Sequence, residues 1–317
     1  MANSKQITLI KWQLPMKRVI YAMIPLVLAS IYFFGWKSLA MLIAVNLAGF
    51  IAEYAFARYY KESVSSSVFV SSTLFMLILP PALPIWMGVV GIIFGIVFGK
   101  MVFGGFGKNV FNPALVGRAF IYINFGLPMT GRWSEPFSGL PGGFAAYAAD
   151  AATGATPMRI LADGGSIEWT KLIFGNTSGC FGETSALLIL LGGIYLIWRK
   201  HASWKIVISC LLSFLAVQAL LFWGIGAEKA LSPLQATLSG GFMLGLLFMA
   251  TDPVTAPKRD ESKYIYGIMI GLLTVIIRTY SVWAEGMMFA ILLANMFAPI
   301  TDFAINEYLP KKPKKRK

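Results

Sequence analysis

The sequence predicts an all-α, polytopic membrane protein with about ten transmembrane helices. Hydrophobic residues make up 57% of the 317 residues and charged residues only 13%. The mean hydropathy is +0.69, and this balance differs from that of soluble domains, which carry roughly 25% charged residues. Apolar stretches recur along most of the chain, whereas the charged residues collect at its ends and in short loops.

Each expected span is an apolar stretch bounded by charged, Gly or Pro residues. A helix needs roughly 20 apolar residues to cross the hydrocarbon core, and fewer where it is broken. On this rule we expect spans near 19–36, 38–57, 66–80, 85–103, 109–126, 180–198, 206–223, 233–251, 264–280 and 287–304. The first stretch follows a basic start and resembles a secretory signal, but the many later spans favour an uncleaved helix.

The two halves of the chain share one order of helix breaks. A Pro-rich break at 79–84, a Gly-spaced span and Asn112-Pro113 are matched by a break at 251–257, a Gly-spaced span and Asn295 with Pro299. An odd number of helices per unit inverts the second copy, as in transporters; alternatively, the prolines simply end helices. One membrane domain, 1–317, is expected to comprise a first five-helix repeat at 19–126, a loop at 127–179, a second repeat at 180–304 and a basic tail at 305–317.

The formal net charge of +13 indicates orientation in the bilayer. Basic residues do not form a stripe with interleaved aromatic residues, which argues against nucleic-acid binding. They fall in Lys5 to Arg18, Arg58 with Lys61, Lys108, Arg199 to Lys205, Lys258 to Lys263, and the tail. The positive-inside rule then places both termini in the cytoplasm and the interval 127–171 outside. The tail serves as a topology anchor or contacts anionic lipid.

Two cysteines and one histidine leave little scope for metal chemistry. Cys180 and Cys210 are too few for a disulfide framework or for an iron–sulfur site supplied by this chain alone. Both are interpreted as packing residues. His201 lies in a basic loop without a neighbouring ligand, so a charge cluster is favoured over a metal site.

Charged residues inside the expected spans are candidates for function, because charge in a membrane is costly and usually faces the bundle interior. They are Glu53, Arg118, Glu183, Asp252 and Asp302. Glu183 serves either cation transit or as a buried hydrogen-bond acceptor. Asp252 either binds a cation or caps a broken helix.

A glycine-rich turn leads into a helix over 104–120. Gly104 and Gly105 allow a backbone to approach a planar or anionic ligand, and Asn112 and Arg118 add amide and guanidinium donors. The segment is not a P-loop, because Asn109 stands where Ser or Thr follows the Lys. A tight turn between spans is the alternative interpretation.

The longest polar interval contains Asp150-Ala151-Ala152-Thr153-Gly154-Ala155-Thr156-Pro157. Small neighbours leave the Thr156 hydroxyl open to a bulky group, and Pro157 restricts the backbone to extended or turn geometry. Thr156 is therefore a candidate modification site.

Together these segments resemble the subunit family that contains NqrB of the sodium-pumping NADH:quinone oxidoreductase and RnfD of the Rnf ferredoxin:NAD oxidoreductase. The resemblance covers nearly the whole chain. Its most specific part is the flavinylation motif D-x-x-(S/T)-G-A-T, carried by Asp150, Thr153, Gly154, Ala155 and Thr156. The segments 104–120 and 178–186 fit two further family motifs.

The resemblance implies a cofactor set and partners. A periplasmic flavin transferase would join FMN through its phosphate to Thr156, with Asp150, Thr153 and Gly154 recognised by that enzyme. A second, noncovalent riboflavin would lie in the membrane domain, for which Asn112 and Arg118 are candidate contacts. Electrons would pass between flavins in a complex with other subunits, one of them also flavinylated, coupled to Na⁺ or H⁺ translocation across the bacterial cytoplasmic membrane. The implied fold is similar to urea transporters, with two inverted five-helix repeats.

The branch within the family and the class of function each leave alternatives. The short N-terminal region and Pro157 resemble RnfD, whereas Gly107-Lys108-Asn109 and the segment 117–120 look more like NqrB. We favour an Rnf-type subunit, with NqrB-type quinone chemistry near Gly104 and Gly105 as the alternative. A solute channel or carrier and a flavin-free scaffold subunit are the competing functional classes.

Overall fold

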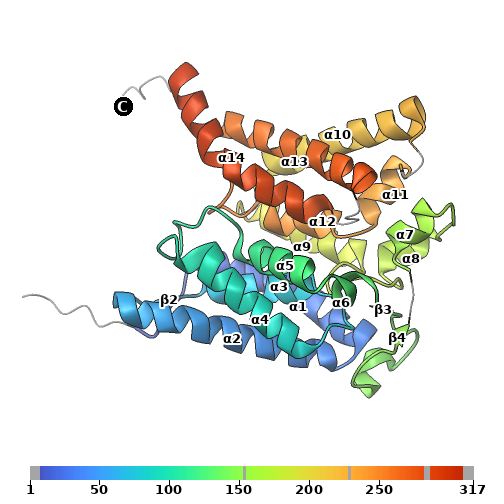
Figure 1. Ribbon diagram of the computed structural model, residues 1–317, viewed down its shortest axis with the longest axis horizontal. Helices are drawn as coiled ribbons and strands as arrows, with labels where there is room; N and C mark the ends of the chain where they lie inside the picture. Colours follow the sequence, from blue (N-terminus) through green and yellow to red (C-terminus); the bar gives the residue numbers. More distant parts are fainter. Residues whose placement is uncertain (1–7, 153–154, 228–229, 282–285, 310–317) are drawn as a thin grey trace, which may run out of the picture.

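The computed structural model describes residues 8–152, 155–227, 230–281 and 286–309, and most of its regular structure is helical (Figure 1). The first half contains β1 (Ile10–Lys11), α1 (Leu14–Phe34), α2 (Lys37–Tyr60), β2 (Val64–Ser65), α3 (Ser67–Leu77), α4 (Ile85–Ile96), the π-helical η1 (Val97–Met101) and α5 (Pro113–Asn124). The connecting interval contains α6 (Gly126–Thr130), β3 (Trp133–Ser134), the 3₁₀ turn η2 (Gly142–Ala145), β4 (Ala151–Ala152), α7 (Pro157–Ala162) and α8 (Trp169–Phe174). The second half contains α9 (Ala186–Trp198), α10 (Trp204–Ala219), the π-helical η3 (Leu220–Ile225), α11 (Pro233–Leu238), α12 (Phe242–Leu244), the π-helical η4 (Gly245–Met249), α13 (Asp260–Tyr280) and α14 (Gly286–Tyr308).

Long apolar helices confirm the prediction of a polytopic helical membrane protein. Within the described ranges, five helices are long and apolar enough to cross a bilayer: α1, α2, α10 with η3, α13 and α14. Shorter apolar helices are α3, α4 with η1, and α9. These shorter helices lie beside the Pro-rich and Gly-rich segments, where neighbouring backbone and side chains must satisfy the broken helix ends.

Three boundaries differ from the expected spans for local physical reasons. The segment before α9 is not helical, because Phe181 N–H donates to the Leu79 carbonyl at 3.0 Å and Gly182 N–H donates to the Leu77 carbonyl at 2.7 Å. The expected span at 233–251 is divided into α11, α12 and η4 at Ser239 to Gly241, where Gly240 has a φ of +59°. α14 continues to Tyr308 and so includes the first residues of the expected tail.

Helix packing within the two halves follows one plan. α2 packs on α3 and α4, and α4 packs on α5; in the second half α10 contacts η4 and α13, and α13 packs on α14. Contacts of α1 with α9 and of α5 with α14 join the halves. The closest crossings need glycine: a Cβ on Gly95 would overlap the Pro113 carbonyl, and a Cβ on Gly271 would overlap the Ser213 hydroxyl.

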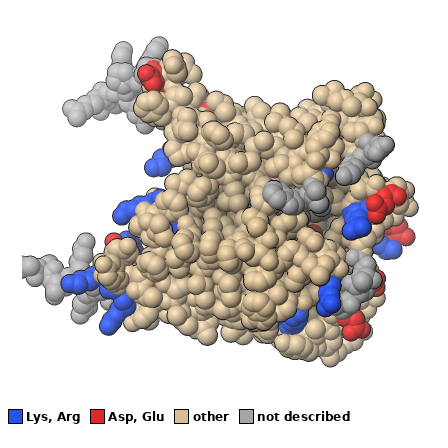
Figure 2. Space-filling model, in the orientation of Figure 1, with Lys and Arg blue, Asp and Glu red and all other residues tan. Residues whose placement is uncertain are grey.

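The two ends of the bundle differ in structure and charge. Figure 1 places β2 and the last turn of α14 at one end, and α6, α7, α8 with the antiparallel pair β3–β4 at the other. We call these the terminal side and the loop side. On the face drawn in Figure 2, Lys and Arg predominate at the terminal side, whereas both signs of charge occur at the loop side. The functional side chains are distributed between these two ends.

Candidate functional site

The largest cavity, the loop-side cavity, has a volume of about 620 Å³ and is lined by Thr156. Segments far apart in the sequence form its walls: Tyr122 on α5, Trp133 on β3, the turn at 177–179, and the break at 238–240. Tyr122 and Trp133 are both buried and contribute planar rings. The cavity therefore offers aromatic surface beside a hydroxyl group.

Thr156 occupies the N-cap position of α7. Its backbone is extended, and its carbonyl accepts hydrogen bonds from the N–H groups of Arg159 at 2.9 Å and Ile160 at 3.0 Å. Pro157 takes the first helical position, where its missing N–H costs nothing. Within the described part of the chain the Thr156 hydroxyl makes no capping bond, so capping does not occupy it.

The rest of the sequence motif leads into this position from β4. Ala151 and Ala152 pair with Ser134 and Trp133 in an antiparallel register, which holds the motif against the cavity wall. Asp150 is exposed just before β4, and Ala155 is half-buried beside Thr156. Thr153 and Gly154 lie outside the described residues. The exposed carboxylate of Asp150 is thus accessible to a modifying enzyme.

A buried ion pair forms the floor of the loop-side cavity. Arg118 Nη1 lies 3.6 Å from Glu183 Oε1, and their side chains are 4% and 6% exposed. Arg118 also donates from Nη2 to Cys180 Sγ at 3.4 Å. Glu183 lies against the break in the second half, where a Cβ on Gly241 would overlap its carboxylate. The pair therefore connects the two halves of the chain.

A second arginine, Arg278 of α13, stands on the other side of this break. It donates to the Ala236 carbonyl at 2.9 Å and lies over the rings of Phe214 and Phe242, 5.6 and 5.8 Å from their centroids. Beyond the ion pair the space narrows to about 10 Å³, lined by the charged groups and by apolar side chains such as Met249. This gap is smaller than a single water requires by volume.

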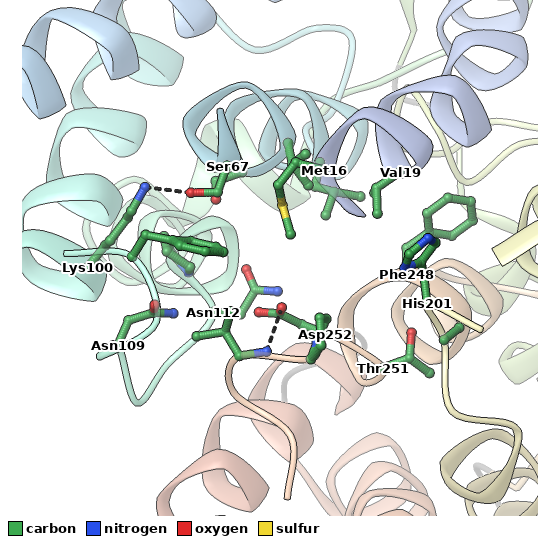
Figure 3. A pocket seen from close by; sticks show the side chains of 18 of the residues that line it. Met16, Val19, Ser67, Lys100, Asn109, Asn112, His201, Phe248, Thr251 and Asp252 are labelled. Carbon is green, nitrogen blue, oxygen red and sulfur yellow. Dashed lines mark hydrogen bonds between the residues drawn. The ribbon is translucent and has the colours of Figure 1, made fainter. Parts of the chain in front are cut away.

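The terminal-side cavity lies at the opposite end of the bundle and is lined by Asn109, Asn112 and Asp252 (Figure 3). Its volume is about 50 Å³. Asn112 caps α5, since its Oδ1 accepts from Ala114 N–H at 3.0 Å. Asp252 caps the broken segment after η4 by accepting from Val254 N–H at 3.1 Å and Thr255 Oγ1 at 3.3 Å. Both also present polar groups to the cavity.

Lys100 lines the terminal-side cavity as part of a buried ionic network. Its ammonium donates to Glu53 Oε2 at 2.6 Å and to Ser67 Oγ at 2.7 Å, and it is 1% exposed. Glu53 Oε1 accepts from Ser65 N–H at 2.9 Å. Lys100 belongs to the π-helical η1, a helix type that is rare and frequent at functional sites. Sequence reasoning selected Glu53 but missed Lys100 and Arg278, although each is a charged residue within an expected span.

The candidate residues fall into separate groups. Thr156 and Glu183 line the loop-side cavity, whereas Asn112 and Asp252 line the terminal-side cavity. Arg118 borders the narrow gap between them. Gly104 and Gly105 form a turn with φ values of +100° and +88°, which only glycine adopts readily. Neither glycine lines the two cavities as described.

These features define a polytopic helical membrane protein in which a buried ion pair separates polar cavities at opposite ends. The model of the NQR2, RnfD, RnfE family matches residues 8–310. The chain belongs to this family, which confirms the resemblance drawn from its motifs.

Curated relatives share one name, that of the NqrB subunit of the Na(+)-translocating NADH-quinone reductase. The chain is 37% identical over 311 residues to NqrB of Klebsiella pneumoniae (strain 342), covering 89% of this chain and 72% of the relative. It is 38% identical over 299 residues to NqrB of Neisseria meningitidis serogroup A, covering 92% of this chain and 72% of the relative.

Proposed function

We propose that this chain is the membrane subunit of an ion-translocating electron-transport complex and carries FMN covalently on Thr156. The observation that supports this most is the position of Thr156 on the wall of a cavity of about 620 Å³. Ligand pockets have volumes of roughly 300–1,000 Å³, so a flavin ring system fits this cavity by size. The family membership and the relatives' names support a place in a respiratory complex.

In this proposal the residues of the chain anchor and surround the flavin. Thr156 provides the oxygen of the phosphoester, and β4 with α7 sets where that anchor lies. Tyr122 and Trp133 offer planar surface, and aromatic rings favour offset stacking with other ring systems. The flavin itself supplies the electron-transfer chemistry.

We propose ten spans in two inverted five-helix repeats, with both termini in the cytoplasm and the interval 127–179 outside. The similar packing plans of α2 to α5 and of α10 to α14 support the repeat. The predominance of Lys and Arg at the terminal side supports the orientation. Thr156 is then accessible to a periplasmic flavin transferase and to a flavinylated partner subunit, both of which are proposed partners in the bacterial cytoplasmic membrane.

The terminal-side cavity is the proposed region for noncovalent riboflavin. Asn109, Asn112 and Asp252 offer the donors and acceptors that the polar edge of a flavin needs. The described volume of about 50 Å³ is well below that of a ligand pocket, so flavin binding requires wall side chains such as Met16 to move. No electron-transfer step is derived through this cavity.

Cation movement is assigned to the acidic groups in the two cavities. Glu183 faces the loop-side cavity and Asp252 the terminal-side cavity. Carboxylates inside a membrane bundle mark ion paths, and either Na⁺ or H⁺ suits them. The relatives' names favour Na⁺. They also favour quinone reduction as the second candidate function, in place of the Rnf-type partners.

Mass spectrometry of the peptide that contains Thr156 tests the covalent flavin directly. The chain should be co-expressed with a flavin transferase and purified from membranes. We expect the peptide to carry the added mass of FMN, less one water, and the denatured band to fluoresce. An unmodified peptide from cells with an active transferase would contradict the assignment.

Asn112→Asp tests the terminal-side cavity. Aspartate preserves the cap of α5 but replaces an amide donor by a second carboxylate near Asp252. We expect heat-released, noncovalent flavin to fall at least tenfold per mole of protein, with covalent FMN unchanged as an internal reference. Asn124→Asp, at the exposed other end of α5, is the matched control. Unchanged flavin in the first variant, together with tighter Na⁺ binding, would favour a cation site instead.

A further inference from the structure

A third cavity, the lysine cavity, lies at the terminal side and has a volume of about 430 Å³. The turn between α9 and α10, the segment after η4 and the first turn of α13 form it. Its lining includes Lys200, Lys205, Lys258 and Lys263 against one acid, Asp260. Neither the electron-transfer proposal nor the ion path uses these residues.

The lysine cavity has an excess of positive charge. Asp260 pairs with Lys205 at 2.7 Å and with Lys263 at 3.0 Å, so one carboxylate serves two ammonium groups. Among the described residues, Lys200 and Lys258 have no carboxylate within ion-pair distance. Four lysines and one aspartate leave three formal positive charges around the cavity. A ligand that fits it is therefore anionic.

The neighbouring histidine does not add to this charge. Burial, together with the positive charges of Arg18 and Arg199, lowers the pKa of His201. The ring is neutral at pH 7 and lies 2.9 Å from Arg18 through Nε2. The lysines alone thus set the electrostatic character of the cavity.

The surroundings of the lysine cavity indicate a lipid. Trp204, which lines it, and Tyr264 lie at the starts of α10 and α13, each about 6 Å from the Lys205 ammonium. Aromatic and basic residues of this kind gather at the level of the lipid headgroups. Exposed apolar side chains continue along the same two helices and offer contacts for acyl chains: Ile208, Leu212, Ile265, Ile268 and Leu272.

We propose that the lysine cavity binds the phosphate of an anionic phospholipid headgroup. A phosphate diester gives an ammonium cluster the acceptor oxygens it lacks, and basic pockets between spans on the cytoplasmic side bind such headgroups. The site has a mechanical link to the terminal-side cavity, since His201, Thr251 and Pro253 line both cavities (Figure 3). A bound headgroup therefore supports one wall of the terminal-side cavity.

The test compares lipid retention by the full chain, in its complex where that assembles, with native mass spectrometry. The probes are phosphatidylglycerol and phosphatidylcholine with the same acyl chains. We expect selective retention of phosphatidylglycerol, and about thirtyfold weaker retention in Lys200→Gln/Lys258→Gln, from about 1 kcal/mol for each lysine.

Lys11→Gln/Lys61→Gln is the matched control, because both lysines are exposed at the terminal side and outside the cavity. Lys61 also shares the positive φ of Lys200, 55° against 59°. Equal loss in both double variants, or equal retention of the two lipids, would overturn the proposal. Inorganic phosphate and glycerol phosphate form a separate arm: displacement of the lipid by either at micromolar concentration would identify a soluble phosphate as the ligand and contradict the lipid assignment. Gel filtration establishes that each variant is folded.

Discussion

Thr156→Ala is expected to abolish covalent flavin while the membrane domain stays folded. The phosphoester needs the threonine oxygen, and alanine has none. Thr156 is half-buried, and within the described residues its hydroxyl caps no helix, so its removal costs little stability. Fluorescence of the denatured band and the mass of the Thr156 peptide measure the result, with membrane insertion monitored in parallel.

Two variants make this result specific. Thr156→Ser keeps a hydroxyl at the same position and should retain the covalent flavin. Thr177→Ala removes another threonine from the wall of the loop-side cavity and should leave the covalent flavin unchanged. Covalent signal that persists in Thr156→Ala, or that vanishes in Thr177→Ala, is incompatible with Thr156 as the acceptor.

Lys100→Met is expected to cause the largest loss of stability among substitutions in the bundle. Methionine nearly conserves the length of the side chain but leaves the Glu53 carboxylate buried without its cation, 2.6 Å from where the ammonium was. Removing one partner of a buried ion pair costs about 3–5 kcal/mol. A lower unfolding temperature in mild detergent and a reduced yield of folded protein are the measurements.

A double-mutant cycle separates lost charge from lost packing. Adding Glu53→Leu to Lys100→Met removes both charges, and most of the lost stability should return, since apolar replacements of buried pairs are often neutral. Lys108→Met, at an exposed lysine after the same helix, should change stability by less than about 0.5 kcal/mol. Additive losses in the double variant would show that the ion pair does not account for the effect of Lys100→Met.

Much of the helical pattern follows from the sequence, because apolar stretches of membrane length have few alternatives. The deviations arise where tertiary contacts override local pattern. The segment before α9 reads as part of an apolar span, yet its N–H groups bond to the end of α3. Gly240 and Gly241 divide an expected span because Glu183 needs the space of a missing Cβ. Such contacts involve residues more than 50 positions apart and leave no local signature.

The candidate site is partly predictable for a different reason. Thr156, Glu183 and Asp252 stand out as a motif residue or as charges among apolar neighbours. The cavities do not, because their walls come from several separate segments. Lys100 has the same signal as Glu53, a charge within an apolar span, but its location near the end of that stretch resembles a snorkelling lysine. Only the structure shows that it points inward to Glu53.

The narrow gap between the two cavities has a consequence for leakage. Its volume of about 10 Å³ and its lining by Arg118, Arg278 and Met249 leave no continuous column of water through this part of the bundle. A hydrated cation therefore meets both a steric and an electrostatic barrier there. Electron transfer needs only proximity of donor and acceptor, not an opening. A closed wall of this kind insulates the membrane against ion short-circuit while remaining permeable to electrons.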